Sequence, residues 1–383
     1  MMPGILPMKN GKYRVTLDYG KKPNGDRDRR YKTVDTMKEA EKILVEFKYN
    51  KQRNHLVHSN KMTVGEYLEY WLNHCVDSTL HETTIYGYRN IIYNHVIPFL
   101  GNIDLQKIQP AQVQQYYKHL IKEKGLSPNT VIKHHALLNN ALRYGVVNQM
   151  VYRNVADGVK LPSKKNFECN YYTQEQLAIL LKKVVGTKIE VPIYLAGFLG
   201  LRREEICGLK WKNVNFTDRI IFIKEVRVSA GKLTVTKEPK TEKSKRALYI
   251  EDELYEVLLK CKANYDKNKK LLGSEFDNSG YVYAKSNGKP YKVNYITDQF
   301  KEFLHKNELP KIRLHDLRHS VASILYDEGL DLKSISEVLG HSNVGTTDKI
   351  YTHRFDNTHK KTVSVLSAAL KRTIDPVTMG CEN

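Results

Sequence analysis

The sequence predicts a multi-domain protein of the α+β class, with a small mixed module first, a helical domain second and a larger mixed domain last. Its 383 residues suggest two or three domains. Hydrophobic residues make up 41% of the chain, which is enough to build several cores. Strand-like alternation is confined to roughly the first 60 residues and to part of the last domain, while helical spacing fills the rest.

The net positive charge of the chain indicates which class of molecule it binds. The chain has 62 Lys and Arg against 42 Asp and Glu, a formal charge of +20, and such an excess favours a polyanion. No stretch reaches the ~18 apolar residues of a membrane span, and no basic amphipathic helix indicates membrane binding. The start of the chain lacks the pattern of a secretory signal. We therefore expect a cytoplasmic protein that binds nucleic acid.

Cysteine usage points to neither a disulfide framework nor a zinc finger. The five cysteines are scattered and form no CxxC pair. We expect reduced thiols and no metal or other cofactor.

Residues 1–60 are expected to form a basic module. Alternation at 11–18 and 31–34 predicts strands joined through a Pro-Asn-Gly turn, and helical spacing begins near Thr36. The module holds 14 Lys and Arg against seven Asp and Glu. A small sheet backed by a helix can present arginines to a DNA groove or to phosphates; a solvated basic hairpin is the alternative. The candidate DNA-binding residues are Arg14, Arg27, Arg29 and Arg30.

Residues 63–157 are expected to form a helical DNA-binding domain. Thr63 and Glu66 have the spacing of a capping box. Further helices are predicted at 82–95, 110–122 and 128–149. Tyr86, Tyr88, Tyr116 and Tyr117 recur at helical spacing and are expected in its core. Residues 158–170, rich in Lys, Pro and Ser, read as a linker.

Residues 171–373 are expected to form a catalytic α+β domain, followed by a tail at 374–383. Strands are predicted at 219–228, 233–237 and 246–250 and form a small antiparallel meander. Helices flank this meander in the prediction. Their expected ranges are 173–185, 191–200, 251–263, 293–306, 314–328 and 332–339.

Polar groups gather where these helices and turns begin or end. Taken singly, none is specific. His315 and His319 have the i, i+4 spacing of a metal-binding face, but Arg318 between them would repel a cation and no acidic or cysteine partner lies nearby in the pattern. The segments that carry the pattern are GLRREE (200–205), PKT (239–241), HDLRHS (315–320), LGHSN (339–343) and IYTH (350–353).

In this order and spacing, the segments resemble those of the tyrosine recombinases, specifically the integrases of phages and conjugative transposons. The resemblance spans nearly the whole chain and implies an arm-binding module, a helical core-binding domain and a catalytic domain. It also implies site-specific DNA cutting and rejoining through a 3′-phosphotyrosyl intermediate, without metal or ATP. A type IB topoisomerase and a non-catalytic DNA-binding accessory protein are the alternatives.

By the same resemblance, Tyr351 is the nucleophile and His315 its general base. A phenol has a pKa of about 10, so it needs help to lose its proton. Arg202 and Arg318 stabilise the phosphate, because guanidinium forks neutralise its non-bridging oxygens. His341 donates a hydrogen bond to the phosphate.

Lys240 resembles the general acid that protonates the departing 5′-oxygen, with Lys243 and Lys245 as competitors. Glu205 lies one helical turn after Arg202 and is expected either to orient it or to be a surface carboxylate. Asp316 is expected to be a carboxylate at a helix start.

The resemblance extends to assembly. Residues 358–371 are expected to form a helix that docks on a neighbouring protomer, with packing on its own domain as the alternative. The implied partners are double-stranded DNA at core and arm sites, three further copies in a homotetramer, an excisionase and a host DNA-bending protein.

Overall fold

The structure is a computed structural model, and it divides into two units, Met1–Asn166 and Phe167–Asn383. Each unit is described by itself. The residues that the structure describes are 3–21, 26–52, 62–76, 80–165, 170–231, 233–239 and 244–340. No helix among them is long and apolar enough to cross a membrane.

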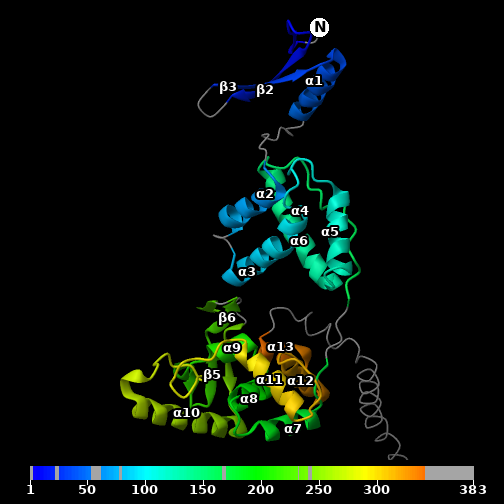
Figure 1. Cartoon of the computed structure of the whole chain (residues 1–383). Coiled ribbons are helices and arrows are strands. Elements are labelled where there is room, and N and C mark those ends of the chain that lie inside the picture. Colours follow the sequence, from blue (N-terminus) through cyan, green and yellow to red (C-terminus); the bar gives the residue numbers. More distant parts are fainter. Residues whose placement is uncertain are drawn as a thin grey trace, which may run out of the picture. The chain divides into compact units, whose positions relative to one another are not determined.

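The first unit begins with a three-stranded antiparallel sheet of order β1-β2-β3, followed by one helix (Figure 1). The elements are β1 (Ile5–Pro7), β2 (Tyr13–Lys21), β3 (Arg27–Val34) and α1 (Met37–Gln52). The sequence predicted β2, β3 and α1 approximately, whereas β1 was missed because three residues are too few to show alternation. A small core joins the sheet to α1 through Ile5, Val15, Val34, Ala40 and Leu44.

Alternation along the strands separates the four candidate arginines. Val15 packs toward α1, so Arg14 and the residues that share its side of the sheet face away from the helix. Arg27 and Arg29 lie on that side, where both approach Asp18 at 3.6 and 3.3 Å. Arg30 lies on the other side. Its guanidinium covers the ring of Tyr19, which in turn packs on Phe47 of α1.

The rest of the first unit is a helical bundle. Its helices are α2 (Val64–Trp71), α3 (Glu82–Ile91), α4 (Ile97–Leu100), α5 (Pro110–Lys122) and α6 (Pro128–Val147). The predicted capping box at Thr63 is present, with its hydroxyl and the Glu66 carboxylate each accepting a backbone N–H. The predicted helix at 82–95 is present, but its last turn, Ile92–Val96, is π-helical and leads into α4. Another π-helical turn, Leu72–Val76, follows α2.

The aromatic residues of this bundle mostly follow the prediction. Tyr116 and Tyr117 are fully buried, and Tyr88 stacks on Trp71. Tyr86 departs from it, because 48% of its surface is exposed. Periodicity placed Tyr86 near the apolar stripe of α3, but only Ile85 of that helix is buried.

A buried histidine makes the stability of the bundle depend on pH. His134 on α6 is 2% exposed, and its Nδ1 lies 2.7 Å from the Tyr116 hydroxyl. Burial, together with the neighbouring His95, lowers the pKa of His134 to about 4. In the unfolded chain the pKa of histidine is about 6.5, so the unfolded state binds the proton first as the pH falls. The contribution of His134 to the free energy of unfolding therefore keeps its full value above about pH 6.5 and falls progressively as the pH drops toward 4.

We expect acidification from pH 7 to pH 5 to lower the free energy of unfolding of the bundle by about 1–2 kcal/mol through His134. Trp71 lies in the bundle and Trp211 in the second unit, so a Trp211→Phe background reports bundle unfolding in urea by fluorescence. The same scan on His134→Gln keeps all the carboxylates, so the difference between the two proteins isolates the contribution of His134. Equal pH dependence in the two proteins would contradict the expectation.

The second unit has helices both before and after its strands in the sequence, and these helices and strands share one hydrophobic core (Figure 1). The helices of this unit are α7 (Gln174–Val184), α8 (Glu190–Leu199), α9 (Arg203–Gly208), α10 (Asp252–Leu272), α11 (Tyr295–Lys306), α12 (Asp316–Asp327) and α13 (Leu332–Leu339). All of them were predicted as helices, α9 only by its start within residues 200–205, and most of the other ends agree to within a turn; α10 is longer than expected.

The predicted single meander is wrong, because the strands form two separate sheets. The strand expected at 219–228 is two strands, β5 (Ile220–Ile223) and β6 (Val226–Ala230). Among the described residues, β6 pairs only with β7 (Leu233–Lys237), whereas β8 (Arg246–Tyr249) returns to β5 in a sheet of order β4-β5-β8. The remaining strand is β4 (Val214–Asn215). Antiparallel alternation cannot reveal which strand a third strand pairs with, so sequence proximity suggested the wrong neighbour.

Candidate active site

Three of the six predicted catalytic residues belong to the part of the chain that the structure describes: Arg202, His315 and Arg318. Lys240, His341 and Tyr351 lie outside the described residues, as do Lys243 and the helix expected at 358–371. The predicted roles of those residues stay predictions.

Arg202 is positioned by a sharp turn between two helices. Gly200 ends α8 in the left-handed conformation with φ of 59°, and a Cβ there would lie 2.4 Å from Leu339, so only glycine fits. Arg202 is then the N-cap of α9. Its guanidinium donates from Nη1 to Glu205 at 2.7 Å and from Nη2 to the Gly340 carbonyl at 2.7 Å.

Glu205 is a buried partner of Arg202. The residue is 2% exposed, so the surface alternative is wrong. Its Oε2 accepts the Arg202 backbone N–H at 2.9 Å, which caps α9. Burial alone would raise the pKa of Glu205, but hydrogen bonds and positive charge from Arg246 and Arg202 outweigh it and lower the pKa. Glu205 is therefore ionised at neutral pH.

The second support of Glu205 is Arg246, which the sequence analysis missed. Arg246 donates to the two carboxylate oxygens of Glu205 at 3.0 and 3.1 Å. A signal was present: along β8 and the residue after it, Arg246 falls in the same alternation as Leu248 and Ile250, both buried. An arginine on a buried face requires an acidic partner.

Arg318 reaches the same turn from α12. Its side chain is buried, with 1% of the residue exposed. Nη1 donates to the Gly200 carbonyl at 2.8 Å, and Nη2 donates to the Leu339 carbonyl. Because Arg202 bonds the next carbonyl, that of Gly340, the two guanidinium groups converge on consecutive peptide units at the end of α13. His341 follows directly in the sequence.

His315 lies one helical turn before Arg318, as the N-cap of α12. Desolvation by the surrounding protein and the neighbouring Arg318 charge lower the pKa of His315, although the residue keeps exposed surface. His319 packs edge-on against it with ring centroids 5.1 Å apart, and burial lowers the pKa of His319 to about 4. Both rings are therefore neutral at pH 7, so His315 is able to accept a proton.

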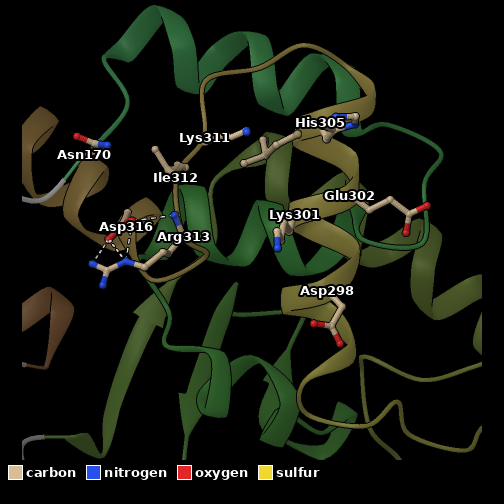
Figure 2. Close-up of a pocket in the computed structure, with 10 residues that line it drawn as sticks. Asn170, Asp298, Lys301, Glu302, His305, Lys311, Ile312, Arg313 and Asp316 are labelled. Atoms are coloured by element: carbon tan, nitrogen blue, oxygen red, sulfur yellow. Dashed lines mark hydrogen bonds and ion pairs between the residues drawn. The ribbon is translucent and has the colours of Figure 1, made fainter. Parts of the chain in front are cut away.

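Asp316 has the structural place that the sequence predicted, at the start of α12. Its buried carboxylate accepts hydrogen bonds from Arg313, including one at 2.6 Å from Nη2 (Figure 2). Both residues line a pocket of ≈ 690 Å³ along α11 (Figure 2). The other lining residues are Asn170, Asp298, Lys301, Glu302, Leu304, His305, Lys311 and Ile312.

Among the remaining candidates, Lys245 forms an ion pair with Glu238 at 2.8 Å. Arg203, next to Arg202, donates to Asn294 at 3.1 Å and pairs with Glu204. The described residues contain no cluster of three or more His, Cys, Asp or Glu that could hold a metal ion. Of the cysteines they contain, Cys75, Cys207 and Cys261 are free thiols.

Comparison with known proteins identifies the family. The phage integrase family model matches residues 171–358, and the model of the phage integrase N-terminal SAM-like domain matches residues 63–121. A tyrosine recombinase XerC-like protein of Caldanaerobacter subterraneus subsp. tengcongensis is 30% identical, over 90% of this chain and 94% of the relative. The ICEBs1 integrase of Bacillus subtilis is 27% identical, over 96% of this chain and all (100%) of the relative.

Solved structures agree on the fold. The Tn1549 transposon integrase, in complex with a circular intermediate DNA, superposes with a TM-score of 0.67 at 21% identity, covering 79% of this chain and 99% of that one. The lambda integrase tetramer bound to a Holliday junction gives a TM-score of 0.57 at 16% identity, covering 90% and 96%. These matches agree with the expected α+β recombinase fold. The family model and the 30% identical relative show that the chain belongs to the phage integrase family and is a tyrosine recombinase, an enzyme of site-specific DNA cleavage and rejoining.

Proposed function

We propose that this recombinase is the integrase of a bacterial mobile element, and that it cuts each strand with Tyr351. The Tyr351 oxygen attacks the scissile phosphorus, the 3′ side of the strand becomes a phosphotyrosyl ester, and the 5′-oxygen leaves with a proton from Lys240. The stored ester bond lets a second 5′-hydroxyl displace Tyr351, so no ATP is consumed. The two arginines neutralise the phosphate in place of a metal ion. The bacterial integrases among the relatives support the mobile-element assignment.

The convergence of Arg202 and Arg318 carries this proposal. The two residues are 116 positions apart, yet their guanidinium groups bond the consecutive carbonyls of Gly340 and Leu339. Two fixed forks side by side match the non-bridging oxygens of one phosphate. Because Arg318 is almost fully buried in this structure, we propose that DNA binding uncovers its guanidinium.

His315 and His341 complete the proposed machinery. The lowered pKa of His315 supports a base that takes the Tyr351 proton at neutral pH. His341 directly follows Gly340, whose carbonyl accepts from Arg202, and this adjacency supports a hydrogen bond from His341 to the same phosphate. We assign the general acid to Lys240 rather than to Lys243 or Lys245, and propose a structural role for Lys245, which pairs with Glu238.

A nicked attachment site tests the chemistry. Cleavage beside the nick releases a short fragment that carries the free 5′-hydroxyl, so rejoining stops and the enzyme stays linked to the 3′ phosphate. We expect a covalent protein–DNA adduct on a denaturing gel in the presence of EDTA, with the nucleotide on Tyr351 by mass spectrometry. Attachment to another side chain, or cleavage that requires Mg²⁺, would reject the proposal.

We further propose that the enzyme acts as a tetramer on two DNA sites. The lambda integrase tetramer on a Holliday junction supports this assembly, and residues 358–371 are the proposed link between protomers. An excisionase and a host DNA-bending protein are proposed as partners that set the direction of the reaction. Sedimentation experiments test this assembly. Tetramers on paired core sites, with monomers on plain duplex DNA, would favour recombination over a topoisomerase activity.

The first sheet is proposed to bind arm sites. Arg14, Arg27 and Arg29 share the side of the sheet that α1 leaves open, with Arg14 stacked over Tyr31 at 5.1 Å. Deleting residues 1–60 should abolish binding to distal arm sites and spare cleavage at the core site, as measured by footprinting and adduct formation. Loss of core cleavage as well would show that the module also serves the core complex.

A further inference from the structure

Arg246 is a buried hub beside the proposed phosphate site. Its side chain is 8% exposed and lies at the first residue of β8. Besides the two bonds to Glu205, Nε donates to the Val338 carbonyl at 2.9 Å and Nη1 to the Ser244 carbonyl at 3.3 Å. One guanidinium thus ties together the start of β8, helix α9 and the end of α13.

The geometry around Glu205 makes the link to Arg202 direct. Oε1 accepts from Nη1 of Arg202 at 2.7 Å and from Nη1 of Arg246 at 3.0 Å. Oε2 accepts from the Arg202 backbone N–H at 2.9 Å and from Nη2 of Arg246 at 3.1 Å. Each carboxylate oxygen is therefore shared between the two arginines, and the plane of the carboxylate is fixed from both sides.

Close packing at the end of α13 reinforces this arrangement. Gly340 has φ of 65°, and a Cβ there would lie 2.9 Å from Nη1 of Arg246. Arg246 therefore packs against the peptide whose carbonyl accepts from Arg202. Displacement of Arg246 would disturb both groups that hold the Arg202 guanidinium, namely Glu205 and the Gly340 carbonyl.

We propose that Arg246 is a positioning residue for strand cleavage, which holds Glu205 and Gly340 so that Arg202 points at the scissile phosphate. This inference rests on the role proposed above for Arg202. Arg246 itself is too buried to bind DNA, so it acts through its neighbour.

The charge of the scissile phosphate provides the test. A methylphosphonate replaces one non-bridging oxygen with a methyl group and carries no negative charge, so an arginine that neutralises this charge becomes dispensable. We expect Arg246→Met to slow adduct formation on the phosphate substrate by about 10- to 100-fold, the usual effect of losing the support of a catalytic group. On the methylphosphonate, both Arg246→Met and Arg202→Ala should react nearly as fast as the wild type.

Three variants guard against trivial explanations. Arg219→Met removes an exposed arginine just before β5, paired with Asp252 at the start of α10, and should leave both rates unchanged. Arg246→Met combined with Glu205→Gln leaves no unpaired buried charge if the single variant fails to fold, and should show the same preference for the uncharged substrate. Arg246→Lys keeps the charge but loses the fork, and should show a smaller loss with that preference.

The outcomes separate the inference from its premise. If Arg202→Ala is restored by the methylphosphonate while folded Arg246 variants are equally slow on both substrates, Arg246 is a structural residue only and the inference is overturned. If Arg202→Ala is not restored, the proposed role of Arg202 fails, and the inference fails with it. Parallel restoration of both variants supports the inference.

Discussion

Tyr351→Phe should eliminate the covalent adduct on a nicked attachment site. Removing one oxygen removes the nucleophile and leaves the ring, so DNA binding and folding should be retained. Loss of a covalent nucleophile lowers turnover by about 10⁴-fold or more, which places the residual rate below detection on a denaturing gel. The wild type should form the adduct equally in EDTA and in Mg²⁺.

A matched tyrosine controls for this experiment. Tyr249 lies on β8 of the same unit with 73% of its surface exposed, and no role is assigned to it. Tyr249→Phe should therefore form the adduct at the wild-type rate. An adduct formed by Tyr351→Phe would remove this residue from the mechanism and with it the proposed reaction.

Arg318→Lys should lower the rate of adduct formation by about 10²- to 10³-fold, the scale of losing one transition-state contact. Lysine keeps the positive charge, but a single ammonium cannot replace a planar fork that bonds both the Gly200 and Leu339 carbonyls. The substitution should weaken the contact with the phosphate and disturb the turn at Gly200. Single-turnover adduct formation at saturating enzyme isolates this step from DNA binding.

The control is Arg219→Lys, because Arg219 is exposed and contacts Asp252 and Tyr255 of α10. It should react at the wild-type rate. Circular dichroism should show that Arg318→Lys is folded. A rate near that of the wild type in folded Arg318→Lys would contradict the role that we propose for the Arg318 fork.

Local signals allowed the helices to be predicted. The Thr63 and Glu66 pair, and prolines in the first turns of α5 and α6, mark where those helices begin. Gly200 marks where α8 ends. Each of these features depends on residues within one turn of each other, so the sequence contains all the information that they need.

Features that depend on distant residues were missed or wrong. The π-helical turn at Ile92–Val96 resembles ordinary helix in its periodicity. β8 pairs with β5 rather than with β7, the strand that precedes it in the sequence. Tyr86 has helical spacing, yet 48% of its surface is exposed in the described part of the chain.

The same division applies to the site. The sequence by itself determined the order of Arg202, His315 and Arg318, and hence the expected chemistry, because residue types and spacing suffice to resemble a family. Only the tertiary structure decided how these groups are held. Glu205 and Arg246 are 41 residues apart, and the fold brings the first residue of β8 to the buried carboxylate on α9. A buried charge requires a partner, but the fold, not the spacing along the chain, selects which residue provides it.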